Sequence, residues 1–268
     1  MTRGSPGCMA SPDSGEMVRA ERLTRHYDRF IGLERVSFTI PNAQTVAVIG
    51  PNGAGKSTLF RLLTGYLPPT DGTAVIRGFD IQRDRLAAAA LLGYLPENGP
   101  LYNDLAPIDL LRFFGRARRM RATDLDSRIR TLAESCGIGP ILDKPIGQLS
   151  KGLRQRVGVA QALLHDPPIL IMDEPTAGLD PNQIAEFHDQ IRTYSRTKTI
   201  LVATHSLAEV EAIADRVLFI HRGRLVFDGS PAQLFAAGSL EAAFRRVTQD
   251  AAHEPLQAAL AEAAGARR

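Results

Sequence analysis

Four residues early in the chain have the types and spacing of a phosphate-binding loop. Gly50, Gly55, Lys56 and Ser57 fill the pattern G-x-x-x-x-G-K-[ST]. Glycines let the backbone curl so that N–H groups point at phosphate oxygens. A lysine here places a compact positive charge against the β- and γ-phosphates, and a serine hydroxyl can hold Mg²⁺. The other loop residues expected to line the site are Pro51, Asn52, Gly53, Ala54 and Thr58.

The segments on either side of this loop support nucleotide binding over a chance glycine-rich turn. An apolar run over 45–49 precedes the loop, and a helical apolar pattern over 57–67 follows it. The N-terminal dipole of that helix is expected to face the same anion. Strand, loop and helix in this order are the context that the motif requires.

A pair of carboxylates follows a second apolar strand. Asp173 and Glu174 come directly after the uninterrupted apolar run 169–172, which is typical of a central strand in a parallel sheet. Buried acids need a compensating cation, and the carboxyl ends of such strands are where α/β sheets bind ligands. We therefore predict that Asp173 holds Mg²⁺ and that Glu174 is the base that positions an attacking water.

One histidine has a comparable position. His205 follows the apolar strand 199–203, so it is predicted to reach the same edge of the sheet and to act there. A histidine without such a placement is more often structural. The structural role is assigned to His26, His165, His188, His221 and His253.

Composition is that of an ordinary globular protein. Of the 268 residues, 44 % are apolar and 23 % charged, and the net charge of +3 is too small to indicate a nucleic-acid binder. No apolar stretch approaches the length of a membrane span, and nothing near the start resembles a secretory signal, so we expect a cytoplasmic protein. The two cysteines, Cys8 and Cys136, indicate no disulfide framework, and Cys136 is expected in the core.

The chain is predicted to comprise an extension, one domain and a tail. Residues 1–17 are rich in Gly, Ser and Pro and are expected to be disordered, with Met17 a possible alternative start. The domain covers 18–240, and 241–268 is predicted as a helical tail, loosely held from about residue 249.

Within the domain, strand-like and helical patterns alternate. Segments 18–40, 45–49 and 73–77 predict short antiparallel strands beside the phosphate loop, with a turn at 27–30. A helical pattern over 105–142 follows, and a further helix opens at Ser150, which stands where an N-cap is expected.

Two features each allow two interpretations. Tyr27 at the predicted turn is either a half-buried packing residue, which the pattern alone favours, or a ring stacked on a base. The arginines of the helical region either form a solvated helix face, which is favoured, or contact anionic lipid or an acidic partner. These arginines are Arg112, Arg116, Arg118, Arg119, Arg121, Arg128 and Arg130.

Taken together, the motifs resemble the ATP-binding subunit of an ABC transporter. Residues 50–58 resemble the Walker A loop, 169–174 Walker B, and 149–156 the signature motif, in the order of that family. In addition, 177–180 resembles the D-loop, His205 the switch histidine and Tyr27 the adenine-stacking aromatic. The resemblance covers about residues 18–248.

The resemblance implies an α/β fold of the P-loop NTPase class. Its RecA-like core has a mostly parallel sheet, accompanied by an antiparallel β subdomain and a helical subdomain near 98–164. Two copies would pack head to tail with ATP and Mg²⁺ between them, as a homodimer or with a related ATPase. Ser150 and Gly152 of one copy would then touch the γ-phosphate bound by the other, and Asp180 of the D-loop is counted among the nucleotide-binding residues. Glu174 would orient the water, and His205 would contact the γ-phosphate.

The sequence departs from the family pattern at the metal site and in the signature motif. Glu97 stands where a glutamine usually contacts the metal, and a carboxylate there can still coordinate Mg²⁺ while adding negative charge. In the signature motif, Lys151 and Leu153 replace a glycine and a glutamine. Lys151 either adds positive charge near the γ-phosphate or faces solvent.

The function implied is that of an ATPase powering a separate membrane permease at the inner face of the cell membrane. Segment 93–102 and the pattern L-S-K-G-x-R-Q-R are similar to those of ABC-2 exporter ATPases, including those of gliding-motility systems, so export is expected. An importer ATPase is the first alternative. A soluble ABC protein acting on DNA or ribosomes is the second, and it is disfavoured because the chain has no tandem cassette or long coiled coil; no nucleic-acid partner is expected.

Overall fold

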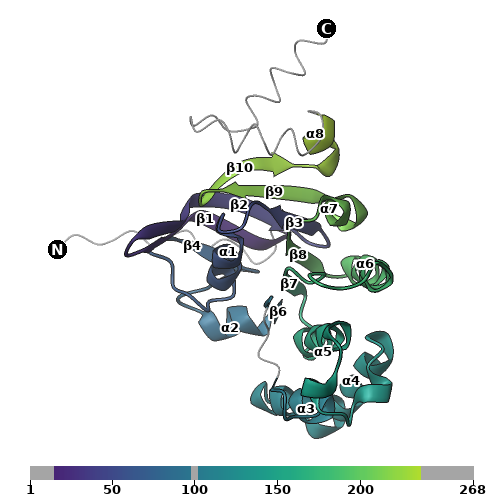
Figure 1. Cartoon of the computed structure of the whole chain (residues 1–268). Coiled ribbons are helices and arrows are strands. Elements are labelled where there is room, and N and C mark those ends of the chain that lie inside the picture. The colour runs from purple at the N-terminus through teal and green to yellow at the C-terminus, as the bar shows by residue number, and fades with distance from the viewer. Residues whose placement is uncertain (1–14, 98–101, 237–268) are drawn as a thin grey trace, which may run out of the picture.

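A six-stranded sheet forms the centre of the computed structural model, which describes residues 15–97 and 102–236 (Figure 1). Its strand order is β10-β9-β3-β8-β7-β6, and β6, β7, β8, β3 and β9 run parallel while β10 pairs antiparallel with β9. The bounds are β3 Thr45–Ile49, β6 Leu92–Leu95, β7 Ile169–Asp173, β8 Thr199–Thr204, β9 Arg216–His221 and β10 Arg224–Gly229. This sheet confirms the predicted α/β class.

A second, antiparallel sheet covers part of the first. Its order is β2-β1-β4-β5, and the strands are β1 Glu16–Tyr27, β2 Phe30–Pro41, β4 Asp71–Ile76 and β5 Phe79–Asp80. The prediction that segment 45–49 belongs with these antiparallel strands is wrong. That segment is β3, which pairs in parallel with β8 and β9, because its uninterrupted burial requires partners on both sides.

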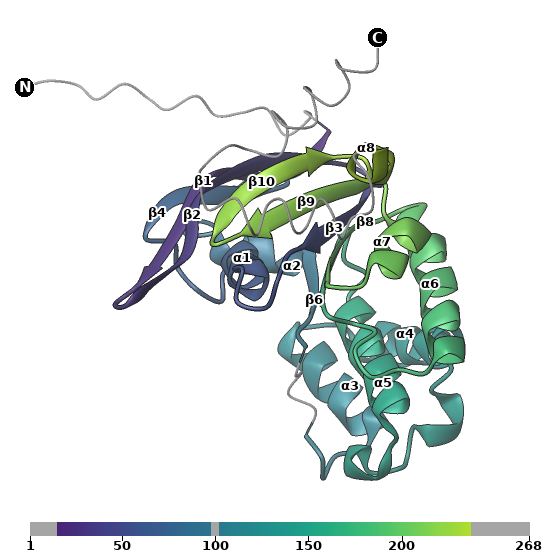
Figure 2. The ribbon, with the colours of Figure 1, turned by 45° about the horizontal axis from the view of Figure 1, so that its top comes forward.

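The helices fall into two groups (Figures 1 and 2). Helices α3, α4 and α5 form a separate helical portion beside the sheets, while α6 and α7 lie along the parallel sheet. The bounds are α1 Lys56–Leu63, α2 Arg85–Ala90, α3 Pro107–Ala117, α4 Ala122–Ser135, α5 Lys151–Leu163, α6 Pro181–Ser195, α7 Leu207–Ile213 and α8 Pro231–Ala236, with short 3₁₀ turns at Gly139–Ile141 and Ile146–Gln148. Among the described residues, none of the helices has the length and apolar character needed to cross a membrane.

Alternate residues of the parallel strands enter different cores. In β7, Ile169 and Ile171 pack with α1 and the antiparallel sheet, whereas Leu170 and Met172 pack with the helical portion. Both faces are therefore covered, which explains why the strand is an uninterrupted apolar run. Buried Cys136 lies in the second core, as predicted, while Cys8 is outside the described residues.

Some predicted boundaries move. β1 begins at Glu16, which pairs with Pro41, so the strand includes Met17 and starts inside the predicted extension. α1 ends at Leu63 rather than 67, because Thr64 caps it and Gly65 follows with φ 67°. The predictions for 1–14 and for the tail 241–268 lie outside the described residues, and a start at Met17 stays a prediction.

Six of the seven arginines singled out in the sequence are exposed, as a solvated face requires. Arg128 is the exception, since its guanidinium contacts the Leu163 carbonyl at 2.9 Å and Asp166 at 3.0 Å. That residue joins α4 to the end of α5 and is structural.

Candidate active site

Four neighbouring parallel strands end at one edge of the sheet and deliver the predicted site. β3 leads into the phosphate loop, β7 ends at Asp173, β8 ends before His205, and β6 is followed by Glu97. Adjacent parallel strands place their carboxyl ends together. Loops that are up to 155 residues apart in the chain, from Gly50 to His205, therefore meet at this edge.

The phosphate loop is held open by glycine conformations. Gly50, Gly53 and Gly55 have φ of 153°, 78° and 114°, a region that favours glycine. A Cβ at Gly50 would collide with the Ile220 carbonyl, and one at Gly55 with the Gly32 carbonyl. Close backbone approach therefore requires glycine at Gly50 and Gly55, while Gly53 has open space around it and only its positive φ favours glycine. Helix α1 starts directly after Gly55, at Lys56.

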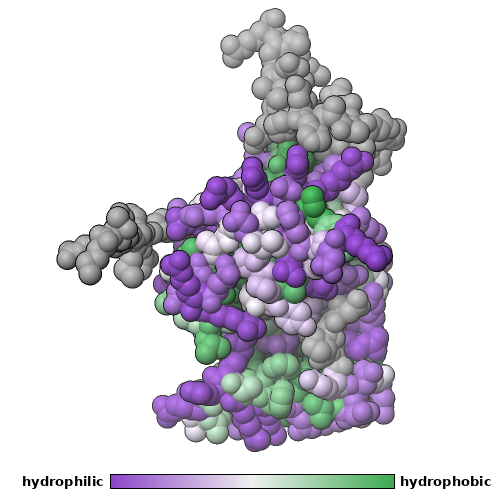
Figure 3. All heavy atoms as spheres, turned by 90° about the vertical axis from the view of Figure 1, so that its left-hand side faces the viewer, coloured by the Kyte–Doolittle hydropathy of each residue, from purple (hydrophilic) through white to green (hydrophobic). Residues whose placement is uncertain are grey.

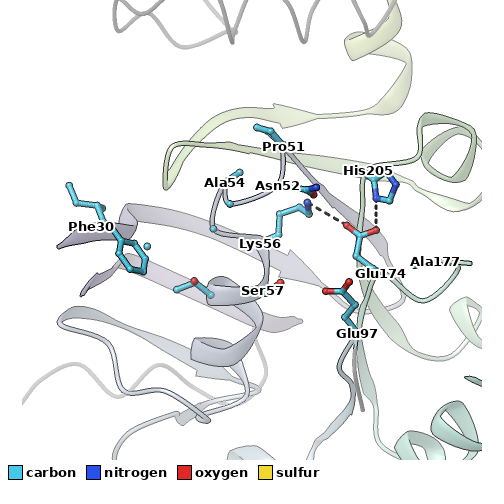
Figure 4. Close-up of a pocket in the computed structure, with 15 residues that line it drawn as sticks. Phe30, Pro51, Asn52, Ala54, Lys56, Ser57, Glu97, Glu174, Ala177 and His205 are labelled. Atoms are coloured by element: carbon cyan, nitrogen blue, oxygen red, sulfur yellow. Dashed lines mark hydrogen bonds and ion pairs between the residues drawn. The ribbon is translucent and has the colours of Figure 1, made fainter. Parts of the chain in front are cut away.

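The side chains of Lys56, Glu174 and His205 meet beside the loop (Figure 4). The buried Lys56 Nζ donates to the Gly50 carbonyl at 2.9 Å and lies 3.4 Å from Glu174 Oε1. Glu174 Oε2 in turn contacts His205 Nδ1 at 2.7 Å. The Glu174 backbone is in the left-handed region, with φ 49°, and its N–H donates to the Ala203 carbonyl at 2.9 Å. Such strain in a non-glycine residue is typical of a functional position.

Asp173, at the end of β7 and directly before Glu174, suits a metal ion. The residue is 3 % exposed, and its Oδ1 has no hydrogen-bond partner among the described residues. Burial raises the pKa of Asp173, and Glu174 and Glu97 raise it further, while the Ser57 hydroxyl and Lys56 lower it. The described residues contain no group of three His, Cys, Asp or Glu arranged for a metal. That composition is compatible with Mg²⁺, which uses one or two carboxylates together with hydroxyl, water and phosphate oxygens.

These side chains border a cleft of about 440 Å³. Its lining comprises residues 51–58, Glu97, Glu174, Ala177 and His205 on one side, and Phe30, Ile31 and Gly32 from the start of β2 on the other. Figure 4 shows Phe30 across the cleft from Glu174 and His205. The structure thus brings together most of the predicted site, and the structural histidines His26, His165, His188 and His221 do not line it; His253 is outside the described residues.

Tyr27 does not line this cleft. The tyrosine is half-buried, and its ring stacks on Phe30 with centroids 4.6 Å apart and planes at 21°, while the Arg25 guanidinium lies 5.0 Å from its centroid. Phe30, 63 % exposed, is the aromatic that borders the cleft. The sequence pattern did not single out Phe30. The predicted turn at 27–30 was a signal, since Tyr27 and Phe30 pair across it and either ring could border the cleft.

The predicted signature and D-loop residues also lie away from the cleft. Ser150 caps α5, accepting a hydrogen bond from the Leu153 N–H at 3.3 Å, and Gly152 packs against Gln183. Asp180 caps α6 through a capping box with Gln183. None of Ser150, Gly152 and Asp180 lines the cleft of its own chain. Lys151 is exposed, and its side chain lies against Gly178.

A mostly parallel sheet with a phosphate loop, a buried lysine and paired strand-end carboxylates defines a P-loop nucleoside triphosphatase (NTPase). The family model described as "ABC transporter" matches residues 33–177. The chain belongs to the ABC transporter family as its ATP-binding subunit, an ATPase, which confirms the resemblance seen in the sequence.

Similar proteins agree. The ABC transporter ATP-binding protein NatA of Bacillus subtilis is 36 % identical over 75 % of this chain and 82 % of its own length. The lantibiotic transport ATP-binding protein SrtF of Streptococcus pyogenes is 36 % identical over 80 % and 93 %. The probable multidrug ABC transporter ATP-binding protein YbhF of Escherichia coli is 34 % identical over 82 % of this chain, which spans only 38 % of it.

Solved structures show the same fold. The structure of an ATP-binding subunit of an ABC transporter superposes with a TM-score of 0.78 at 28 % identity, covering 87 % of this chain and 99 % of that one. A bacterial Atm1-family ABC exporter with ATP bound gives a TM-score of 0.76 at 28 % identity, over 94 % and 45 %. These superpositions confirm the predicted fold.

Proposed function

We propose that the chain hydrolyses ATP with Mg²⁺ in a head-to-tail pair and so powers export through a separate permease. The observation that carries this proposal is the contact of Glu174 with Lys56 on one side and His205 on the other. The Glu174 carboxylate is the base in this arrangement, with the phosphate-binding cation of Lys56 at 3.4 Å and the His205 ring at 2.7 Å. Such an arrangement is suited to positioning water against a γ-phosphate.

The cleft residues take three roles in this reaction: phosphate binding, metal binding and activation of the attacking water. The loop N–H groups and the α1 dipole bind the phosphates, and Lys56 exchanges its contact with Glu174 for the phosphates, which frees Glu174 to accept a proton from water. Ser57, Asp173 and Glu97 would hold Mg²⁺, which neutralises charge that develops on the phosphates. His205, two-thirds exposed, orients Glu174 and faces the cleft.

A second copy would complete the site. Ser150, Gly152 and Asp180 lie away from the cleft of their own chain, so we assign them to the nucleotide bound by the partner. That partner is a second copy or a related ATPase. Closure by ATP and reopening after hydrolysis transmit work only if the permease binds the two states with different affinity.

Apolar side chains suggest where the permease docks. Figure 3 shows a hollow between the sheets and the helical portion, with apolar side chains gathered on the helical side. Two exposed aromatics of that portion, Tyr102 and Phe113, lie edge to face with centroids 6.5 Å apart. Exposed aromatic clusters of this kind are typical of protein–protein contacts. Export is favoured over import by the kinship with SrtF and with the Nod factor export ATP-binding protein I of Sinorhizobium fredii.

Two substitutions test the chemistry. Lys56→Ala should abolish ATP turnover, and unchanged hydrolysis would refute its phosphate role. Glu174→Gln should bind ATP without hydrolysing it, and sedimentation with ATP and Mg²⁺ should show a stable dimer. Glu211→Gln, an exposed glutamate on α7, is the control and should turn over like the wild type. A monomeric Glu174→Gln protein at saturating ATP would contradict the sandwich.

Co-purification tests the partner. Membrane fractions should retain the chain together with a multi-span protein, and vesicles containing both should move substrate outward when ATP is supplied on the side of this chain. Recovery with a substrate-binding lipoprotein would favour import. Recovery with ribosomes or DNA, and no membrane protein, would contradict the permease assignment.

A further inference from the structure

Glu209 lies in the first turn of α7, where its spacing from Ser206 is typical of an exposed capping box at the start of a helix. Ser206 and Glu209 have the spacing S-x-x-E, in which the glutamate ordinarily bonds back to the serine N–H at the start of a helix. Only half of this box forms. The Ser206 Oγ accepts from the Glu209 N–H at 3.4 Å, but the Ser206 N–H donates to Thr204 Oγ1 at 3.0 Å instead. The carboxyl group of Glu209 is therefore left for another partner.

That carboxyl group turns into the protein. Glu209 is 2 % exposed, and its Oε2 accepts a hydrogen bond from Thr176 Oγ1 at 3.1 Å. The Thr204 hydroxyl also interacts with the carboxyl group, while Oε1 has no well-aligned partner among the described residues. A buried acid with an unfilled oxygen is costly, and an apolar side chain would pack here without that cost.

The two threonines belong to the two loops that form the reacting centre. Thr176 lies two residues after Glu174, and Thr204 immediately precedes His205. Glu209 thus joins the loops whose side chains meet in the 2.7 Å contact between Glu174 Oε2 and His205 Nδ1. Burial raises the pKa of Glu209, and the Glu174 carboxylate raises it too, while the two threonine hydroxyls and His205 lower it.

We propose that Glu209 is a positioning residue for ATP hydrolysis, tying the Thr176 and Thr204 loops together so that Glu174 and His205 keep their contact. The inference rests on the proposed function. Glu209 does not line the cleft and touches no reacting atom. Its contribution is hydrogen bonding rather than charge.

The test compares steady-state ATP hydrolysis by the full chain and its variants. Glu209→Ala should lower kcat about 10- to 100-fold, the penalty of small misplacements, with KM for ATP changed less than about threefold. Glu209→Gln, which keeps the shape and hydrogen bonding, should retain at least about a third of the wild-type kcat. Glu211→Ala, two residues along α7 and exposed, is the matched control and should match the wild type.

A second variant keeps the test valid if Glu209→Ala fails to fold. Thr176→Val removes the donor while preserving shape, and should lower kcat about 3- to 10-fold. Combined with Glu209→Ala, where that protein folds, it should cost little more than Glu209→Ala alone, because both break one connection. Full activity of Thr176→Val, equal losses in Glu209→Gln and Glu209→Ala, or unchanged kcat in Glu209→Ala would each overturn the proposal. A wild-type chain without ATPase activity would instead refute the proposed function itself.

Discussion

The ion pair between Lys56 and Glu174 makes a quantitative prediction about the nucleotide-free protein. The two side chains are 7 % and 11 % exposed, with Nζ 3.4 Å from Oε1. At an effective dielectric constant of about 20, charges at that distance attract by about 5 kcal/mol, most of which is offset by the desolvation of both groups. The net contribution of the pair to the free energy of unfolding is therefore small, but removing one partner alone can destabilise the protein strongly, because it leaves a buried charge unpaired.

Removing Lys56 should destabilise the protein more than removing the charge of Glu174. Without Lys56, the carboxylates of Glu174 and Asp173 lose their nearest buried cation, while Glu97 adds to the repulsion. Lys56→Met should lower the free energy of unfolding by about 3–5 kcal/mol, as for other broken buried pairs. Glu174→Gln removes one of the crowded negative charges and leaves Lys56 its contact with the Gly50 carbonyl, so it should cost less than about 1 kcal/mol.

Urea unfolding followed by circular dichroism, without nucleotide or Mg²⁺, measures all four members of the cycle. The double variant should be more stable than Lys56→Met by at least about 1 kcal/mol, because the isolated carboxylate is gone. Arg112→Met is the control, since Arg112 and its partner Asp126 are 44 % and 50 % exposed and the pair should contribute about 1 kcal/mol or less. A Lys56→Met protein as stable as the wild type, or strictly additive effects, would refute the reasoning.

Two further predictions concern the pH dependence of stability and the binding of the adenine base of ATP. Burial lowers the pKa of His165 to about 4, so this histidine takes up its proton in the unfolded chain near pH 6.5 but not in the folded one. Stability should consequently fall as pH drops from about 6.5 to about 4, by up to about 3 kcal/mol from this group, and urea titrations should find that part of the slope missing in His165→Gln. Phe30→Ala should weaken ATP binding about tenfold by removing a stacking surface, whereas Phe79→Ala, outside the cleft, should not; equal affinities by nucleotide fluorescence would exclude Phe30 from base contact.

The position of the cleft in the fold was largely predictable because the motifs around it are local, whereas the roles of its residues stay predictions. A phosphate loop needs glycines and a lysine at fixed spacing, and the ends of apolar strands mark the edge where Asp173 and His205 lie. The placement of β3 was not predictable in this way. Its neighbour β8 comes about 150 residues later, and the direction of pairing depends on that distant partner rather than on the residues of the strand.

The direction in which a side chain points was the second feature that the sequence did not predict. Tyr27 and Phe30 flank one turn and differ in which ring borders the cleft, a choice made by the twist and pairing of the hairpin. Glu209 shows the same limit more sharply. Its pattern specifies a helix cap, but the Thr204 hydroxyl takes the N–H that the cap would use, and the carboxyl group turns inward. Competition between neighbouring hydrogen-bond groups decides such cases, and spacing does not encode it.

The charges at this sheet edge bear on the proposal that two chains share one nucleotide. Among the described residues, Lys56 is the sole buried lysine or arginine, and it interacts with the buried Asp173 and the nearly buried Glu174. A triphosphate adds more negative charge to this group. In the proposed function, Mg²⁺, backbone N–H groups at the start of α1 and cations of the paired chain would compensate this charge. Lys151 is an exposed cation beside the predicted partner-facing Ser150, so the departure from the signature pattern supplies charge where a closed pair would need it.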